Sequence, residues 1–559
     1  MFKITRPEWT KNYTRQGFTS DLTAGFIVGI VALPLCIAFA IASGLTPEKG
    51  IMTGVIAGFI VALLSGSPVQ IAGPSGPFVV IAFGIVDRFG LDGLIIATFT
   101  AGVALLIMSR AGLGTLIKFI PYPVIAGFTS GVAILLITTE FKDLLGIFTG
   151  HLPESIIDKW GVYLDALWTA NGYAIAIAAI TILFMTLQPK LTRRIPGSLT
   201  ALIVTTIIVH IFGWPVETIG SRFGEIQSMF PMPAIPEMSI ETIRAMFNPA
   251  TAIALLVAIE ALLSAVVADG MTGYMHRPNR VLSAQGFANI GTALFGCLPA
   301  TAAIARTATN VRNGGRTPVA GLIHSLTLLL ILLVFGRWAG LIPLACLAAI
   351  LVVVAINMFE WRSFVALSWR SPKSDAAVLL ATLGMTVLVD LETGVLVGMA
   401  LAAAMFIKRM AAVTDIAVVT REPGGATAVT SALAIPRGVD IYEINGPFFF
   451  GAVYKLKEAL HVVSKPPKVL MIRMSKVSAM DSTGLHALEE VHRDAKKQGT
   501  TLIISEIHAQ PFVALMKSGL LDVIGQENVQ SAYEDSIRRA EEIIRLSKIK
   551  PPESVTYTD

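Results

Sequence analysis

The chain has 559 residues, of which 54% are hydrophobic and only 14% are charged, and its formal net charge is +5. A typical soluble domain has about 25% charged residues, and the mean hydropathy of this chain is +0.70. This composition excludes an ordinary soluble protein and predicts a polytopic membrane protein. The cysteines, Cys36, Cys297 and Cys346, all lie in apolar stretches, so neither a disulfide framework nor a metal cluster is indicated.

Apolar segments recur along the first 420 residues, and each span needs about 20 such residues to cross roughly 30 Å of hydrocarbon. We predict about fourteen segments, at residues 21–43, 51–66, 75–88, 91–110, 121–140, 172–189, 197–214, 249–269, 280–297, 300–313, 318–336, 342–358, 375–390 and 392–410. The first follows a basic segment, residues 1–20, that has no small-residue cleavage site. We therefore expect a retained span and not a signal peptide.

Basic residues in the loops predict the orientation. With a cytoplasmic N-terminus, the inside loops contain Arg110, Lys118, Lys190, Arg193, Arg194, Arg277, Arg280, Arg312, Arg316, Arg362, Arg370 and Lys373. The outside loops contain only Lys49, Arg88, Lys142, Lys159, Arg222, Arg244 and Arg337. This excess inside obeys the positive-inside rule, so we expect both termini of the chain to be cytoplasmic.

Two polar breaks interrupt the apolar chain. The first is Gly-Pro-Ser-Gly-Pro at residues 73–77, and the second surrounds Pro299, which lies 225 residues after Pro74. The spans that open the two halves begin near Asp21 and Asn248, at almost the same separation. With about seven spans in each half, the second copy enters the membrane inverted, and paired short segments interrupted by Gly and Pro indicate the binding site of a secondary transporter.

The character of the chain changes after about residue 421, where charged residues return. We predict a strand at 469–474, a helix at 481–497, a strand at 501–505 and helices at 510–518 and 532–546. A small cytoplasmic α/β domain at 421–550 follows from this order, together with a disordered tail at 551–559.

Five ordered stretches resemble the SulP family of anion permeases, the bacterial relatives of solute carrier family 26. They are DLTAGFIVGIVALPLCIAFAIASG (21–44), GPSGP (73–77), LLVAIEALLSAVVADGMTG (255–273), LPATAAIARTATNVRNGG (298–315) and MSKVSAMDSTGLHALEE (474–490), the last resembling a STAS domain. The resemblance implies a seven-plus-seven inverted repeat with core and gate domains, a substrate between the facing ends of spans 3 and 10, and a homodimer. It also implies a multi-pass protein of the bacterial inner (plasma) membrane.

Helix N-termini at the two breaks predict an anion site. Each N-terminus offers unpaired N–H groups and about half a positive charge, which is little screened at membrane depth. On the first side the candidates are Ser75, with its hydroxyl as an added donor, and Gly76. On the second side they are Ala302, Ala303 and Ile304, with the Thr301 hydroxyl nearby.

Glu260 lies about twelve residues into its span, near the bilayer centre, where an ionisable residue indicates function. A desolvated carboxyl group favours its protonated form, so Glu260 is a candidate proton carrier. In the family this position is acidic and in some members binds Na⁺ with hydroxyl groups. Here Ser264 retains one hydroxyl, but Ile304 replaces the other, so we expect proton coupling and keep Na⁺ coupling, or a permanently protonated structural glutamate, as alternatives.

Two further candidates are Arg306 and Ser482. Arg306 matches a family arginine that shapes the positive potential of the site, although an arginine here could equally extend to the cytoplasmic surface. Ser482 matches the residue that is phosphorylated in soluble bacterial relatives of the STAS domain. A phosphate is tolerated at a helix N-terminus, but Asp481 and Ser482 also serve as a helix cap without a regulatory role, and we favour that interpretation.

These features predict a secondary active anion transporter with an elevator-like mechanism and no enzymatic activity. The TAAIAR stretch and the pair Glu260 and Ser264 resemble bacterial members that carry C4-dicarboxylates such as succinate, fumarate and aspartate, so we predict proton-coupled symport of these. Alternatives are a sulfate or Na⁺-coupled bicarbonate transporter, an uncoupled anion channel, and a membrane signalling protein. We expect no cofactor, metal or nucleic-acid partner, and a cytoplasmic protein partner of the STAS domain remains open.

Overall fold

The computed structural model describes residues 13–115, 120–150, 152–153, 155–191, 196–224, 233, 240–418, 435–461 and 466–548. The chain divides into two compact units, Met1–Ala402 and Ala403–Asp559, which we name the helical unit and the α/β unit. The predicted domain boundary at 420/421 and the predicted tail at 551–559 lie outside the described residues.

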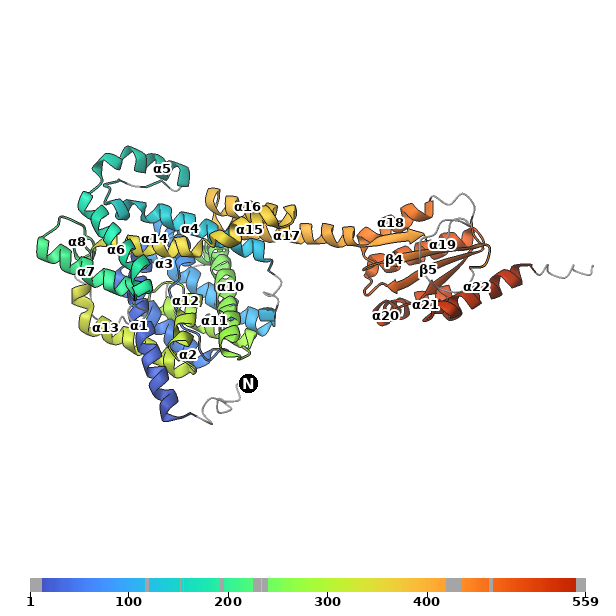
Figure 1. Ribbon diagram of the computed structural model, residues 1–559, viewed down its shortest axis with the longest axis horizontal. Helices are drawn as coiled ribbons and strands as arrows, with labels where there is room; N and C mark the ends of the chain where they lie inside the picture. The colour runs from blue at the N-terminus through green and yellow to red at the C-terminus, as the bar shows by residue number, and fades with distance from the viewer. Residues whose placement is uncertain are drawn as a thin grey trace, which may run out of the picture. The chain divides into compact units, whose positions relative to one another are not determined.

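The helical unit consists of helices and two very short strands (Figure 1). In chain order its elements are α1 (Arg15–Ala42), α2 (Pro47–Leu64), β1 (Ala72–Gly73), α3 (Gly76–Arg110), α4 (Tyr122–Leu145), α5 (Ile156–Asp165), η3 (Leu167–Thr169), α6 (Gly172–Leu191), α7 (Gly197–Phe212), α8 (Ile219–Phe223), α9 (Ile240–Ala245), α10 (Phe247–Thr272), α11 (Pro278–Leu294), β2 (Thr301–Ala302), α12 (Ile304–Arg312), α13 (Pro318–Ala339), α14 (Leu344–Met358), α15 (Trp361–Arg370), α16 (Lys373–Leu388) and α17 (Leu391–Val413), and the last of these continues into the α/β unit.

Fewer helices than the predicted fourteen segments can cross a membrane by length and composition. In the part of the chain that the structure describes, eight stretches are long and apolar enough, one of which, Leu344–Arg370, contains both α14 and α15, and two apolar helices are shorter. The predicted segments 75–88 and 91–110 form one helix, α3, which is kinked at Gly90. Gly90 has φ 68° and ψ −170°, a conformation that glycine adopts without steric cost. The second short segment is α12, of only nine residues.

The two halves of the helical unit repeat one order of elements. The order α1, α2, β1, α3 recurs as α10, α11, β2, α12. The packing recurs as well, because α1 and α2 pack against α13 while α10 and α11 pack against α3. This exchange of partners is the pattern that a duplicated unit with a two-fold relation produces, as the spacing of the two breaks predicted.

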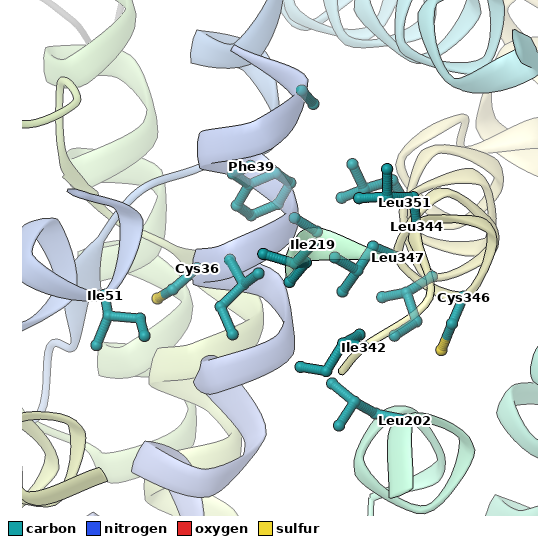
Figure 2. Close-up of a cluster of buried hydrophobic side chains, with 14 of the residues drawn as sticks. Cys36, Phe39, Ile51, Leu202, Ile219, Ile342, Leu344, Cys346, Leu347 and Leu351 are labelled. Carbon is teal, nitrogen blue, oxygen red and sulfur yellow. The ribbon is translucent and has the colours of Figure 1, made fainter. Parts of the chain in front are cut away.

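Apolar side chains and glycines hold these helices together. Figure 2 shows one buried cluster, in which side chains converge from α1 (Cys36, Phe39), α2 (Ile51), α7 (Leu202), α8 (Ile219), the segment before α14 (Ile342) and α14 (Leu344, Cys346, Leu347, Leu351). Elsewhere, a Cβ atom on Gly102 or Gly286 would lie 2.8 Å from the other residue's carbonyl oxygen. Close packing of this kind stabilises helices in lipid, where the hydrophobic effect contributes little.

The α/β unit is a five-stranded sheet with helices. The strands β3 (Asp415–Val418), β4 (Val439–Asn445), β5 (Val469–Lys476), β6 (Thr501–Ser505) and β7 (Val529–Gln530) lie in this order, with β3 antiparallel and the others parallel. The helices are α18 (Phe450–His461), α19 (Ser482–Lys497), α20 (Ala509–Ser518), α21 (Leu520–Ile524) and α22 (Tyr533–Lys548), and η4 (Gln526–Asn528) is a short 3₁₀ turn. The strands and helices predicted from residue 469 onwards all form, with ends that differ by at most two residues.

Candidate anion-binding site

The two chain breaks meet in space. The strands β1 and β2 pair antiparallel, with Ala72 opposite Ala302 and Gly73 opposite Thr301. Beyond this crossing, α3 begins at Gly76 after Ser75, and α12 begins at Ile304 after Ala303. Two helix N-termini therefore start within a few residues of one strand crossing, and each provides N–H groups that have no partner within its helix.

The two N-termini differ in exposure. Ser75 is buried, and a Cβ atom on Gly76 would lie 3.1 Å from Met358 Sδ, 3.6 Å from Phe39 Cε1 and 3.8 Å from Leu136 Cδ2. Apolar side chains of α1, α4 and α14 thus enclose the start of α3. By contrast, Ile304 at the start of α12 is 41% exposed. An anion at the crossing would meet an open side at α12 and an apolar wall at α3.

Polar side chains connect the segment before the first break to neighbouring helices. The Gln70 amide donates to the carbonyl oxygen of Ala261 at 2.7 Å, and the Asn310 amide donates to that of Val69 at 2.9 Å. The Thr307 hydroxyl accepts from the Ile71 N–H at 3.3 Å. Buried backbone groups require such partners, so α10 and α12 fix the approach to β1.

A matching set supports the second break. The Asn289 side chain donates to the carbonyl oxygen of Ala300 at 2.9 Å and accepts from the Ala300 N–H at 3.0 Å. The Thr53 hydroxyl on α2 accepts from the Leu298 N–H at 3.1 Å. Our sequence reasoning missed Thr53, Asn289 and Thr307; the signal that could have found them is a polar side chain within an apolar span.

The predicted residues of the second break divide into two groups. Thr301 and Ala302 are fully buried in the strand pair, and the Thr301 hydroxyl donates to the carbonyl oxygen of Val257 at 3.3 Å. In this arrangement the hydroxyl hydrogen of Thr301 therefore points toward α10 and not toward a substrate. Ala303 caps α12, and Ile304 forms its first residue, so these two remain the candidates that border the open side.

Glu260 lies on α10, next to the crossing. Its Oε2 atom is buried and has no hydrogen-bond partner among the described residues. The Ser75 side chain and Arg306 are both close enough to interact with the carboxyl group electrostatically. The structure thus brings the predicted coupling residue to the predicted anion site.

The Ser264 hydroxyl, a candidate Na⁺ ligand in the sequence, is hydrogen-bonded to a side chain of α12. Its hydroxyl is fully buried and donates to the Thr307 hydroxyl at 3.0 Å. Thr307 in turn accepts from the backbone of the first break. Ser264 therefore connects α10 to α12.

Arg306 crosses from the second break to the first. The side chain is 3% exposed, its Nη2 atom donates to the carbonyl oxygen of Pro74, and its Nη1 atom lies against Gly73, where a Cβ atom would collide with it. The alternative that Arg306 extends to the cytoplasmic surface is wrong, because the guanidinium is held inside. Its positive charge is buried beside the strand crossing.

His324 on α13 is a buried polar residue that our sequence reasoning did not single out. The side chain is fully buried, and neither ring nitrogen has a hydrogen-bond partner among the described residues. Gly58 on α2 leaves room for the imidazole, because a Cβ atom there would lie 3.1 Å from His324 Nδ1. A histidine within an apolar span is the signal that could have identified it.

In the α/β unit, Ser482 is the exposed first residue of α19. The preceding Asp481 caps this helix, since its carboxylate accepts from the Gly484 N–H at 2.8 Å. The predicted cap is thus present, and phosphorylation of Ser482 stays a prediction. The described residues contain no group of three or more His, Cys, Asp or Glu side chains that could hold a metal ion.

Comparison with known proteins identifies the family. A profile of the sulfate permease family matches residues 18–382, and a profile of the STAS domain matches residues 431–536. The chain belongs to the sulfate permease family. The predicted resemblance and the predicted fold class, a helical polytopic membrane protein with a C-terminal STAS domain, are confirmed.

Two sequence relatives of this permease span nearly its whole length. "Putative sulfate transporter YvdB" of Bacillus subtilis is 42% identical over 521 residues, which are 93% of this chain and 97% of that protein. "Bicarbonate transporter BicA" of Picosynechococcus sp. is 29% identical over 536 residues, 93% of this chain and 94% of that protein. Both names describe anion transporters, and neither mentions dicarboxylates.

Solved structures show the same fold. The transmembrane domain of a cyanobacterial bicarbonate transporter BicA is 31% identical with a TM-score of 0.62, over 68% of this chain and 98% of that one. Murine solute carrier 26 family member A9, an anion transporter in the inward-facing state, is 20% identical with a TM-score of 0.86, over 96% and 93% of the two chains. The permease is therefore an anion transporter of the sulfate permease family and a polytopic membrane protein.

Proposed function

We propose that this permease is a secondary active transporter that binds a small anion between the N-termini of α3 and α12 and couples its movement to protonation of Glu260. One observation carries the proposal: at the antiparallel pairing of β1 with β2, two helix N-termini, a buried arginine and a half-buried glutamate with a buried Oε2 atom lie together. Helix N-termini attract anions. A carboxyl group within the membrane is a default candidate for a proton relay.

A proton is a better coupling ion than Na⁺ for this site. Na⁺ is bound by several oxygen atoms, such as the carbonyl groups at interrupted helices. Here the carbonyl oxygen of Pro74 accepts from the Arg306 guanidinium, whose positive charge repels a cation, and Ile304 has no oxygen in its side chain. A proton needs only the carboxyl group of Glu260 itself.

For the substrate we favour an inorganic oxyanion, with sulfate first and bicarbonate second, and we keep the C4-dicarboxylates as a third class. The support is the identity of 42% to a relative named for sulfate and of 29% to one named for bicarbonate. The apolar wall of Phe39, Leu136 and Met358 near Gly76 also restricts the space at the start of α3. Backbone N–H groups select by charge and size more than by chemical identity.

Three further features belong to the same proposal. The anion crosses by an elevator-like movement of the elements around the β1–β2 crossing against the other helices, both termini lie in the cytoplasm, and two copies form a homodimer. The positive-inside distribution of loop charges supports the orientation. The repeated order of elements in the two halves supports alternating access.

Uptake into proteoliposomes tests the function. Labelled sulfate, bicarbonate and succinate are each supplied under an inward proton gradient, an inward Na⁺ gradient and no gradient. We expect the proton gradient, and not the Na⁺ gradient, to drive accumulation of sulfate or bicarbonate, because one pH unit supplies about 1.4 kcal/mol per proton, which corresponds to a roughly tenfold concentration ratio. Electrogenic flux that ignores both gradients would support the uncoupled channel instead.

The coupling residue is tested by Glu260→Gln, which keeps the shape of the side chain and removes its proton exchange. Gradient-driven uptake should fall at least tenfold, while binding of the anion persists. Glu140→Gln is the matched control, because Glu140 is likewise a glutamate within an apolar helix, and buried, but lies on α4; this variant should keep the gradient response. Unchanged gradient-driven uptake in Glu260→Gln would falsify the coupling role.

A further inference from the structure

The short helix α15 exposes a row of large apolar side chains. The chain leaves helical geometry at Phe359 and Glu360, where ψ is 85° and 71°, and none of the ten residues of α15 is buried. Trp361 is 66% exposed, Val365 37% and Trp369 84%. These residues are spaced by four, so they lie along one face of the helix. α15 thus presents two tryptophans outward between the apolar helices α14 and α16.

Basic residues accompany this face. Arg362 and Arg370 each directly follow one of the tryptophans, and both are exposed. Lys373, the first residue of α16, is exposed as well. The nearby acidic side chains have protein partners: Glu360 accepts from the Tyr122 hydroxyl at 2.7 Å and Asp375 accepts from the Ser374 hydroxyl at 3.4 Å. These hydroxyl donors leave both carboxylates charged, so the three exposed basic side chains give α15 and the start of α16 a small positive excess.

The first half of the chain contains a counterpart with the opposite charge. α5 follows α4 as α15 follows α14, and both helices have ten residues. α5 exposes Ile157 at 69% and Leu164 at 66%, and the residues that directly follow them are Asp158 and Asp165, both exposed. α5 also contains Lys159, which is partly buried. The two helices thus share exposed apolar side chains and differ in the sign of the exposed charges that directly follow them.

We propose that α15 is an interfacial helix that binds the headgroups of anionic phospholipids, with Trp361 and Trp369 in the headgroup region and Arg362 and Arg370 on the phosphates. Tryptophan is enriched at membrane interfaces, and amphipathic helices with basic flanks bind anionic lipid surfaces. Arginine pairs with phosphate through two parallel hydrogen bonds. A free anion would use the arginines but would leave the tryptophan row without a role.

The sign reversal agrees with the proposed orientation of the chain. That orientation assigns α15 to the cytoplasmic leaflet, where anionic lipids attract basic residues, and α5 to the outer leaflet. α15 begins three residues after Met358, which lies against the start of α3, so a bound lipid would restrain the chain next to the candidate anion site. The lipid preference itself does not depend on the transported anion.

Lipid retention by the purified full chain tests this inference separately from transport. The protein is equilibrated in detergent with equal amounts of phosphatidylglycerol and phosphatidylcholine, and retained lipids are counted by native mass spectrometry. Wild type should retain phosphatidylglycerol preferentially. In the variant Arg362→Gln/Arg370→Gln, the ratio of retained phosphatidylglycerol to phosphatidylcholine should fall roughly 10- to 30-fold, because each basic residue near an anionic surface contributes about 1 kcal/mol.

Two matched variants complete the test. Arg362→Lys/Arg370→Lys keeps the charges and should retain most of the preference, while Asp158→Asn/Asp165→Asn changes the counterpart helix and should leave it unaltered. The inference is overturned if the glutamine variant retains as much phosphatidylglycerol as wild type, or if all three variants change it equally. Competition by inorganic phosphate at equal concentration distinguishes a free-anion site. If the protein also prefers inorganic phosphate and the glutamine variant loses that preference too, the arginines bind free anions, and the inference is overturned.

Discussion

At the scale of single residues, the strand crossing depends on contacts that one methyl group would destroy. Arg306 Nη1 lies against Gly73, and its Nη2 atom donates to the carbonyl oxygen of Pro74. Gly73→Ala should therefore displace the guanidinium, with a loss of about 1–3 kcal/mol in stability and a loss of anion binding. Thermal unfolding and binding of labelled sulfate measure the two effects.

Gly84→Ala is the matched control for this prediction. Gly84 lies in α3, eight residues after Gly76, and a Cβ atom there would have no other atom within 4 Å. Alanine in a helix interior is more favourable than glycine by roughly 1 kcal/mol. Equal damage from the two substitutions would contradict a specific role of the contact between Gly73 and Arg306.

At the scale of elements, the Asn289 side chain holds the backbone of the second break through two hydrogen bonds, which we name the clamp. Its amide group satisfies both the N–H and the carbonyl oxygen of Ala300. Asn289→Ala leaves both backbone groups buried and unpaired, at a cost of about 1–3 kcal/mol for each. We expect a lower thermal unfolding midpoint and slower uptake.

Asn313→Ala provides the comparison for the clamp. The Asn313 amide donates only within its own segment, to the carbonyl oxygen of Thr309 at 2.8 Å, in a partly buried position. This substitution should change the midpoint little. If it lowers the midpoint as far as Asn289→Ala does, the clamp has no special importance for the second break.

The sequence predicted the two polar breaks better than it predicted the side-chain contacts that support them. Proline and glycine at residues 73–77 and near Pro299 act locally on the backbone, so their effect could be inferred without the fold. The hydrogen-bond partners of Thr53, Asn289 and Thr307 could not be inferred in this way, since each partner is distant in sequence or lies on another helix. The same reason explains why the hydrogen bond from the Thr301 hydroxyl to the carbonyl oxygen of Val257 was not foreseen.

At the scale of the whole molecule, the two units have separate apolar cores. The two largest buried clusters of the helical unit contain residues between Ala32 and Leu391, while those of the α/β unit contain residues from Val439 onwards. The described residues that form the candidate anion site and its apolar wall all lie in the helical unit, between Phe39 and Met358. Substrate preference should therefore belong to the helical unit alone.

Deletion of the chain after residue 420 tests this division. We expect the truncated permease to show slower uptake or weaker assembly and the same order of preference among sulfate, bicarbonate and succinate, because the strand crossing and its supports are retained. Competition of unlabelled anions against labelled substrate measures that order without reference to the amount of active protein. A changed order would show that the α/β unit shapes the site, and complete loss of transport with intact anion binding would assign it a part in the movement itself.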